Sequence, residues 1–439
     1  MNIMFYYNAK YKFALPGQSP SGIAGAIIAA SAMPAGQLLR RDFRKYPYLQ
    51  HRLFDSQLYL SSLDPNVAPT AVVNLASWPW FCPNAVPEYD SDTHASVKHW
   101  KDLHADTLLQ SWPNCLPNHP QAIRSAARAS VQAQLDLGCE MVILPGPLTT
   151  IATQQFAVET EWIDAGLEVC RALKVATPVL ATVGISDAVL RGVDPPQNPL
   201  LHTITNQLSA RADLAGAYIV VEQASETGYV CTSRDTLLSL LLLIDDLVRG
   251  AGKTVLVNYV GTFGAVASAV GASVWSTGYY LSQRRLKLAD FEDKIARAMP
   301  RYHSLRLAGD VGLQVDLERA YAQFGDRILT DTSDGRTLRQ ALESRTYPQS
   351  APEWEYAQSN IAAAAGHYNE IAFKLGQFAT LSPEKRIEMV QRWLEGAVVW
   401  SGNLQRIGIA QSTQTELSHQ AVWLNAFQAW RSYIGPYQP

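Results

Sequence analysis

The sequence predicts an α/β protein, a (β/α)8 TIM-like barrel with a C-terminal helical module. Short apolar segments of strand length recur along the first part of the chain, and stretches with helical periodicity lie between them. Strands that alternate with helices form a parallel sheet, and about eight such units over roughly 250 residues are typical of a closed barrel. We therefore expect the functional residues where the strands end and the next loops begin, at one mouth of the barrel.

The strands are expected from short apolar runs, which are typical of strands buried on both faces. The clearest runs are 53–60, 70–75, 141–144, 179–183, 217–221, 254–258 and 273–277. The eighth strand is either the apolar run 3–7 or the segment 327–330, and the pattern does not choose between them. Residues 121–137 and 236–249 have the apolar spacing of helices. The run 22–30 consists of small apolar residues, and we expect a short helix packed on the barrel rather than a signal peptide.

The chain is expected to divide into two parts. Residues 1–330 form the predicted barrel, and an insert at 78–119 without a clear period is expected to be a loop over the barrel mouth. Residues 331–439 form the helical module, whose expected amphipathic helices are 361–378, 383–400 and 415–434. Tryptophans spaced two helical turns apart in the last two helices are interpreted as core packing.

The composition excludes several classes of protein. The chain has 439 residues, 47% of them hydrophobic, and a formal net charge of -3, so no overall positive charge attracts nucleic acid, whereas a local basic patch stays open. The five cysteines lie far apart without a CxxC pair, and we expect free thiols in a reducing compartment and no metal. No stretch approaches the ~20 apolar residues of a membrane span. These features predict a cytoplasmic protein with no membrane contact and no cofactor.

Asp55 is the first catalytic candidate. It is a lone carboxylate in the apolar run 53–60, where an unpaired buried charge would be costly. The residue is therefore solvated at the barrel mouth or held by partners. It serves either as a general base or hydrogen-bond acceptor for substrate, or as a structural carboxylate that accepts bonds from the backbone and Ser56.

Further polar residues end the predicted strands. Glu222, the second catalytic candidate, closes the strand 217–221 and is followed by Glu226. Asn258 and Tyr259 occupy the same level after the next strand. Because this end of a barrel is the catalytic face, we expect these residues to bind substrate. The other expected substrate-binding residues are Asn74, Trp78 and Trp275.

A possible phosphate site follows the last two predicted strands. Gly261 and Gly264 lead into a helix, and Thr277 and Gly278 follow the strand 273–277. Backbone N–H groups at this place in a barrel commonly bind phosphate. Glycines also simply make turns, and both interpretations stay open.

Ser276 is the third catalytic candidate, as a hydroxyl in the strand 273–277. No histidine stands at a spacing that indicates activation of this serine, and the chain has no GxSxG motif. The histidines at 94, 99 and 104 recur every five residues, which does not keep them on one helical face. The sequence therefore indicates neither a serine hydrolase nor a metal site.

Three segments resemble tRNA-guanine transglycosylases. The run 54–63, FDSQLYLSSL, resembles the family's early strand motif, whose Asp-Ser pair contains an aspartate for base recognition and proton transfer. The run 217–222 is similar to the strand whose Gly-Glu pair lines the base pocket, with Val221 in place of Gly. The run 270–276 resembles a late strand whose final aspartate is the nucleophile, and Ser276 stands there in this chain.

The resemblance implies a barrel that acts on a nucleobase, with Asp55 and Glu222 as base-recognition or acid-base groups. The family's zinc site of three closely spaced cysteines and a histidine has no counterpart here, and its Gln-Gly-Gly segment is Val183-Gly184-Ile185. Base exchange through a covalent nucleic-acid intermediate is therefore not implied.

Three functions are consistent with the sequence. The first is a divergent transglycosylase-like enzyme that binds or acts on a nucleobase, nucleoside or nucleic-acid glycosidic bond. The second is a barrel lyase or isomerase that binds a phosphorylated small molecule through its glycine loops. The third is a catalytically silent barrel that contacts a protein partner through its helical module. We rank the transglycosylase-like function first.

Overall fold

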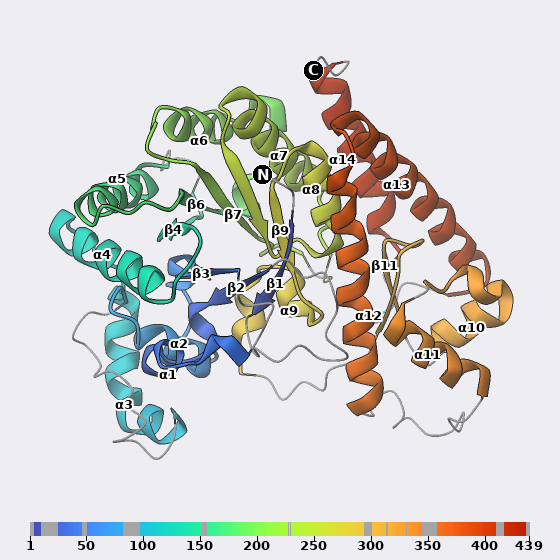
Figure 1. Cartoon of the computed structure of the whole chain (residues 1–439), viewed down its shortest axis with the longest axis horizontal. Helices are drawn as coiled ribbons and strands as arrows, with labels where there is room; N and C mark the ends of the chain where they lie inside the picture. Colours follow the sequence, from blue (N-terminus) through green and yellow to red (C-terminus); the bar gives the residue numbers. More distant parts are fainter. Residues whose placement is uncertain are drawn as a thin grey trace.

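The protein is a mixed α/β structure with a parallel sheet and a helical C-terminal region (Figure 1). The computed structural model describes residues 4–9, 25–45, 51–81, 97–151, 156–226, 228, 230–293, 301–312, 315–330, 332–344, 358–409 and 417–435. No helix in these ranges is long and apolar enough to cross a membrane.

Within the described ranges the main sheet has nine strands, and all of the strand pairs seen there are parallel. The strands are β1 (Met4–Ala9), β2 (Gly25–Ala29), β3 (Arg52–Asp55), β4 (Val142–Leu144), β5 (Leu148–Thr149), β6 (Val179–Ser186), β7 (Gly216–Glu222), β8 (Thr254–Asn258) and β9 (Val274–Thr277). Their order is β3-β2-β1-β9-β8-β7-β6-β4, and β5 also pairs with β6. The first and last strands of this order approach each other, since the Glu140 N–H donates to the Arg52 carbonyl at 3.2 Å.

Helices separate most of the strands, as the sequence pattern predicts. They are α1 (Ala35–Leu39), α2 (Pro69–Ala76), α3 (Val97–Ser111), α4 (Pro120–Asp136), α5 (Ala157–Ala172), α6 (Pro199–Ser209), α7 (Arg234–Asp245), α8 (Gly264–Val270) and α9 (Leu281–Arg284). Local signals fix several of their first turns. Pro199 stands at the start of α6, where the side chain of Asn198 accepts from the Leu200 N–H at 3.0 Å. Ser233 caps α7 in the same way, through the Thr236 N–H at 3.2 Å.

The strands carry apolar side chains on both faces. Val257 and Trp275 belong to a buried cluster with Leu241 of α7, on the face that the helices cover. Leu256 and Val274 alternate with them and belong to a second buried cluster on the opposite face, which we call the inner face. Burial on both faces explains why the strands read as continuous apolar runs.

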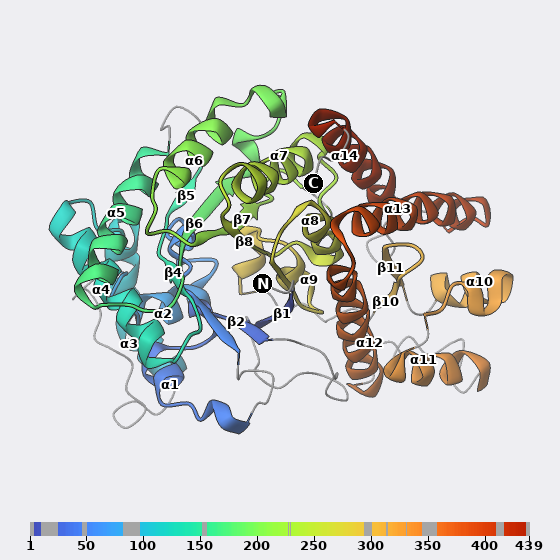
Figure 2. The same cartoon turned by 45° about the horizontal axis from the view of Figure 1, so that its top comes forward.

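The described residues of the C-terminal region form a hairpin and five α-helices. These elements are β10 (Arg301–Ser304), β11 (Gly309–Gly312), α10 (Val315–Phe324), α11 (Ser333–Ser344), α12 (Gln358–Gly376), α13 (Pro383–Arg406) and α14 (His419–Ile434). In both views α12 lies between the sheet and the hairpin, and α14 lies beside α7 and α8 (Figure 1 and Figure 2). The region packs directly on the α/β part, because the ring of Trp423 on α14 contacts that of Phe263 with centroids 5.1 Å apart. Trp423 and Trp430 are both buried in this core.

Several predicted elements are confirmed. The strands predicted at 141–144, 179–183, 217–221, 254–258 and 273–277 correspond to β4, β6, β7, β8 and β9. The run 3–7 overlaps β1, whereas residues 327–330 are the end of a 3-10 turn followed by coil. Of the two segments proposed for the eighth strand, the first is therefore the strand. The three C-terminal helices also form, as α12, α13 and α14.

Three predicted elements are wrong. The run 70–75 lies in helix α2, which begins at Pro69, a residue that starts helices because it needs no N–H partner there. The run 22–30 contains strand β2; Gly25 lies so close to the His51 backbone and the Tyr6 ring that a side chain would collide with them. The run 53–60 is a strand only to Asp55 and then turns.

The insert at 78–119 is only partly a loop. Helix α3 occupies Val97–Ser111 within it, and residues 82–96 lie outside the described part of the chain. Trp112, which follows α3, is buried and donates its indole N–H to the Leu63 carbonyl at 2.7 Å. This end of the insert therefore packs on the segment that follows β3.

Candidate functional site

Asp55 is a fully buried carboxylate at the carboxyl end of β3. Its Oδ2 accepts hydrogen bonds from the hydroxyls of Tyr59 at 2.5 Å and Tyr218 at 2.7 Å. Its Oδ1 accepts from the Gln57 N–H at 3.0 Å. Burial raises the pKa of Asp55 to about 6, although the two tyrosines and the Gln57 N–H oppose this rise. The carboxyl group can therefore both donate and accept a proton near neutral pH.

A chain of buried amides extends from Asp55 across the inner face. The side-chain N–H of Asn258, at the end of β8, donates to the Tyr218 hydroxyl at 2.7 Å. Asn8, near the end of β1, donates its side-chain N–H to the Asn258 Oδ1 at 3.0 Å. The Asn8 Oδ1 is buried without a hydrogen-bond partner. We call Asn8, Asp55, Tyr59, Tyr218 and Asn258 the Asp55 cluster.

Gln57 and Tyr259 border this cluster and bond to each other. Both have left-handed backbones, with φ of 53° and 60°, which residues other than glycine adopt at a cost of about 1–3 kcal/mol. The Gln57 side-chain N–H donates to the Tyr259 hydroxyl at 2.9 Å, and its Oε1 accepts from the Ser31 N–H at 2.8 Å. Strained residues of this kind are over-represented at functional sites.

Ser276 and Trp275 lie on opposite faces of β9. Ser276 is two residues from Val274 and shares the inner face with it. Its hydroxyl is buried and has no hydrogen-bond partner, so no base activates it as a nucleophile. Trp275 is buried in the outer layer, where its indole packs against Gly264. The structure therefore places Ser276 on the face of the Asp55 cluster and Trp275 away from it.

Glu222 ends β7 on the same face as Tyr218 but farther along the strand. The two are four positions apart, which corresponds to about 13 Å along the strand. The Ser186 hydroxyl donates to the Glu222 Oε2 at 2.6 Å, and burial raises the pKa of Glu222. Asp55 and Glu222 are the last residues of β3 and β7, so both stand at the carboxyl end of the parallel sheet.

Glu226 has a different environment from Glu222. Its carboxylate accepts from the N–H groups of Thr232 and Ser233, both at 2.9 Å, and from the Arg191 guanidinium at 2.7 Å. These bonds hold the segment that leads into α7. The structure places Glu226 with this loop and not with Asp55.

The predicted phosphate-binding residues are closely packed. A side chain at Gly264 would collide with the Trp275 ring, and one at Gly278 with the side chain of Gln283. The Thr277 hydroxyl lies 3.0 Å from the Tyr368 hydroxyl. Gly261, with φ of 54°, lines a separate pocket, described below. Gly261 is the member of this set that lines that pocket.

Asn74 and Trp78 support the end of β2. Asn74 donates its side-chain N–H to the Ser31 carbonyl at 2.8 Å, and Trp78 donates its indole N–H to the Ala30 carbonyl at 3.0 Å. The Trp78 ring stacks on that of Trp80 with centroids 4.7 Å apart. The Asn74 side-chain N–H and the Trp78 indole N–H thus bind backbone carbonyls rather than Asp55.

The described part of the chain has no group of three or more His, Cys, Asp or Glu residues arranged to hold a metal ion. No protein-family model matches the chain, and no curated protein is significantly similar to it. The site must therefore be interpreted from its geometry.

Sequence reasoning found Asp55 and Asn258 but missed three residues that complete their network. Tyr218, Tyr59 and Asn8 supply the hydroxyl and amide groups that contact them. The available signal was a polar residue in an apolar strand, which applies to Asn8 and Tyr218 as it does to Asp55.

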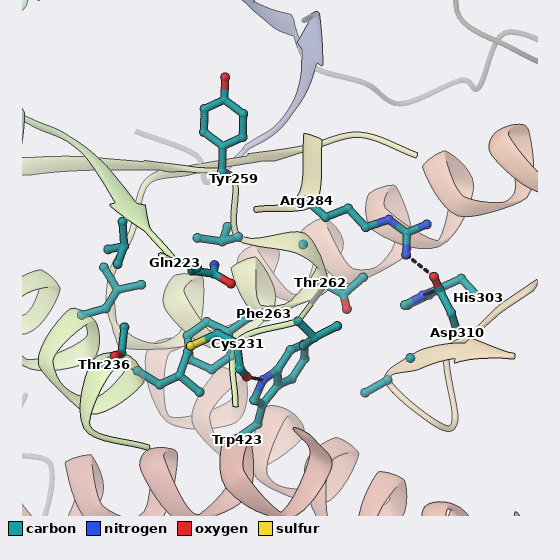
Figure 3. A pocket seen from close by; sticks show the side chains of 18 of the residues that line it. Gln223, Cys231, Thr236, Tyr259, Thr262, Phe263, Arg284, His303, Asp310 and Trp423 are labelled. Atoms are coloured by element: carbon teal, nitrogen blue, oxygen red, sulfur yellow. Dashed lines mark hydrogen bonds and ion pairs between the residues drawn. The ribbon is translucent and has the colours of Figure 1, made fainter. Parts of the chain in front are cut away.

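A pocket that is partly open to solvent lies next to Tyr259, at the border of the Asp55 cluster (Figure 3). Loops after β7 and β8 form one side, and the hairpin β10–β11, α12 and α14 form the other. Gln223 and Tyr259 line it from the sheet, and Trp423 lines it from α14. The pocket thus lies between the α/β part and the C-terminal region.

Proposed function

We propose that the sheet closes into an eight-stranded barrel of the transglycosylase-like kind. Asp55 on β3 and Tyr218 on β7 are hydrogen bonded, yet their strands are five places apart in the sheet order. In a flat sheet, five places correspond to roughly 24 Å. The bond between Glu140 and Arg52 at the two ends of the order also supports closure. Slow hydrogen exchange at the Glu140 amide is expected, and rapid exchange would contradict a closed barrel.

The function that we propose is binding of a nucleobase at the carboxyl end of these strands. The observation that supports it best is Asp55, a wholly buried carboxylate with a pKa of about 6. Nucleobases present N–H groups and carbonyl oxygens on one planar edge, and a carboxyl group that is ready to donate or accept matches such an edge. Asp55 would hold the base and exchange a proton with it.

Two unpartnered groups support the presence of a polar ligand. The Ser276 hydroxyl and the Asn8 Oδ1 are both buried without hydrogen bonds, and both come from strand ends that face inward. A buried polar atom needs a partner, which a ligand or a water molecule can supply. In this proposal Ser276 donates to the base and Asn8 accepts from it.

The proposal does not include a covalent step. Ser276 stands where the resembling family has its nucleophile, but its hydroxyl has no hydrogen-bonded base. Glu222 lies four positions beyond Tyr218 on β7, at the end of the strand. Glu222 would therefore contact the part of the ligand nearer the opening, such as a sugar.

Calorimetric titration with adenine, guanine, cytosine and uracil tests this function. We expect at least one base to bind saturably to the wild-type protein at pH 7.5. Asp55→Asn should weaken this binding by about 10–100-fold, which corresponds to the loss of one hydrogen bond to a charged group. Ribose 5-phosphate serves as the comparison ligand for the phosphate-binding alternative.

Glu159→Gln is a matched control for this experiment. Glu159 is another buried carboxylate, on α5, where it accepts a hydrogen bond from Thr149 outside the Asp55 cluster. The control should leave nucleobase affinity unchanged. Absence of binding by all four bases, or equal affinity in wild type and Asp55→Asn, would refute the proposal.

A further inference from the structure

The pocket between the α/β part and the C-terminal region has one polar end and one apolar end. His303, Asp310 and Arg284 line the polar end, opposite Cys231 and Thr236 (Figure 3). His303 belongs to β10 and Asp310 to β11, so the hairpin brings them together across the pair His303–Asp310. Arg284 stands in a short basic run after the last predicted strand, whereas no sequence motif marks His303 or Asp310.

The three polar side chains form an ordered chain of interactions. Arg284 forms an ion pair with the Asp310 Oδ2 and lies over the Tyr368 ring, with Cζ 3.9 Å from the ring centroid. The Asp310 Oδ1 lies 2.7 Å from the His303 Nδ1. Burial by itself raises the pKa of Asp310, but Arg284 and His303 hold it well below its ordinary value. Asp310 is therefore ionised and fixes the orientation of the imidazole.

The geometry leaves one nitrogen of His303 available for a ligand. An ionised Asp310 accepts a proton-bearing Nδ1, so in the neutral ring Nε2 carries the lone pair. Burial lowers the pKa of His303 more than the Asp310 hydrogen bond raises it, which favours the neutral ring. His303 is 3% exposed, and its Nε2 has no hydrogen-bond partner. A buried acceptor without a donor is costly, and a ligand hydroxyl would satisfy it.

The rest of the pocket suits an apolar ring. The edge-to-face pair of Phe263 and Trp423 lines one wall, with their rings at 69°. Val221, Leu237 and Leu240 complete an aliphatic surface. Pockets that bind small molecules typically combine such a surface with a few fixed polar groups.

We propose that this pocket binds an apolar ring compound that carries a hydroxyl group, and that the His303 Nε2 accepts the hydrogen bond of that hydroxyl. Asp310 and Arg284 act as positioning residues, because they hold the His303 imidazole in the orientation that directs its Nε2 to the ligand. This site is separate from the Asp55 cluster and does not depend on nucleobase binding.

Ligand-observed NMR with phenol and toluene tests the proposal, since the two probes have similar rings and only phenol has a hydroxyl. Phenol should bind saturably and about tenfold more tightly than toluene. His303→Phe should reduce the affinity for phenol to that for toluene. Val230→Trp introduces a large side chain at the half-buried wall of the pocket, and should abolish binding of both probes.

The controls separate this site from the Asp55 cluster. Asp55→Asn should leave phenol binding unchanged, whether or not the nucleobase experiment succeeds. Circular dichroism establishes that each variant is folded, and Val230→Trp keeps the test decisive if His303→Phe does not fold. Equal affinity for phenol and toluene in the wild type, or unchanged phenol binding in Val230→Trp, would overturn the proposal.

Discussion

Asp55→Asn should stabilise the protein at alkaline pH. The pKa of Asp55 in the folded state is about 6, against an ordinary value of 3.8. Each pH unit of this difference corresponds to about 1.4 kcal/mol, so ionisation of the buried carboxyl costs about 3 kcal/mol of folding free energy. Because the folded-state pKa is raised, the protonated Asp55 carboxyl contributes its full stabilisation of the folded state below about pH 3.8. This contribution is lost as the pH rises through 6.

Asparagine resembles the neutral acid in shape and keeps an oxygen for the Gln57 N–H. At pH 8 the variant should therefore be more stable than the wild type by up to about 3 kcal/mol, and the advantage should nearly vanish below pH 4. Urea denaturation followed by circular dichroism, at pH 5 and pH 8, measures the difference. Between these values the wild type should lose about 1.4 kcal/mol relative to the variant.

Asp102→Asn, at an exposed position on α3, is the matched control and should not change the pH dependence. The reasoning is refuted if Asp55→Asn is less stable than the wild type at pH 8, or if the two lose stability in parallel. Either result would mean that the tyrosine hydrogen bonds stabilise the charged carboxylate more than burial destabilises it. If Asp55→Asn is more stable than the wild type but no longer binds a ligand, the charge of Asp55 is retained for function at a cost in stability.

Two further substitutions test the packing of the site. Tyr218→Phe removes the hydroxyl that donates to Asp55 and accepts from Asn258. It should lower the free energy of unfolding, measured by urea denaturation, by about 1–3 kcal/mol because a buried partner is left unsatisfied. An unchanged free energy of unfolding would mean that the network adds nothing to stability. Gly264→Ala introduces a methyl group against the Trp275 ring and should cost about 1–3 kcal/mol, measured by thermal melting. An unaltered melting temperature would show that the ring moves aside without strain.

Much of the fold could be predicted because parallel strands buried on both faces have a simple pattern. The runs at 217–221 and 254–258 are apolar on both faces, and each is a strand. The pattern failed where side chains were small or where a local signal dominated. Strand β2 has glycine and alanine because it lies close to its neighbours, and α2 begins at a proline that outweighs its β-branched residues.

The candidate site could be predicted only in part, since it depends on contacts between distant segments. Asp55 was identifiable as a charge in an apolar run. Its partner Tyr218 lies 163 positions away, and the tyrosine reads as an ordinary strand residue. Trp275 was predicted beside the substrate, but the alternation of side chains in β9 directs it to the outer layer. A shift of the strand register by one residue moves each side chain to the opposite face of the sheet, and sequence alone does not fix that register.

Identification of small molecules that copurify with the protein tests nucleobase binding at the Asp55 cluster most directly. The wild-type protein and Asp55→Asn would be purified in parallel, denatured, and their released compounds compared by mass spectrometry. We predict a nucleobase-containing compound that is released in stoichiometric amount from the wild type and is depleted in the variant. Release of the same compounds in the same amounts from both proteins, or a bound compound that contains no nucleobase, would contradict the proposed function.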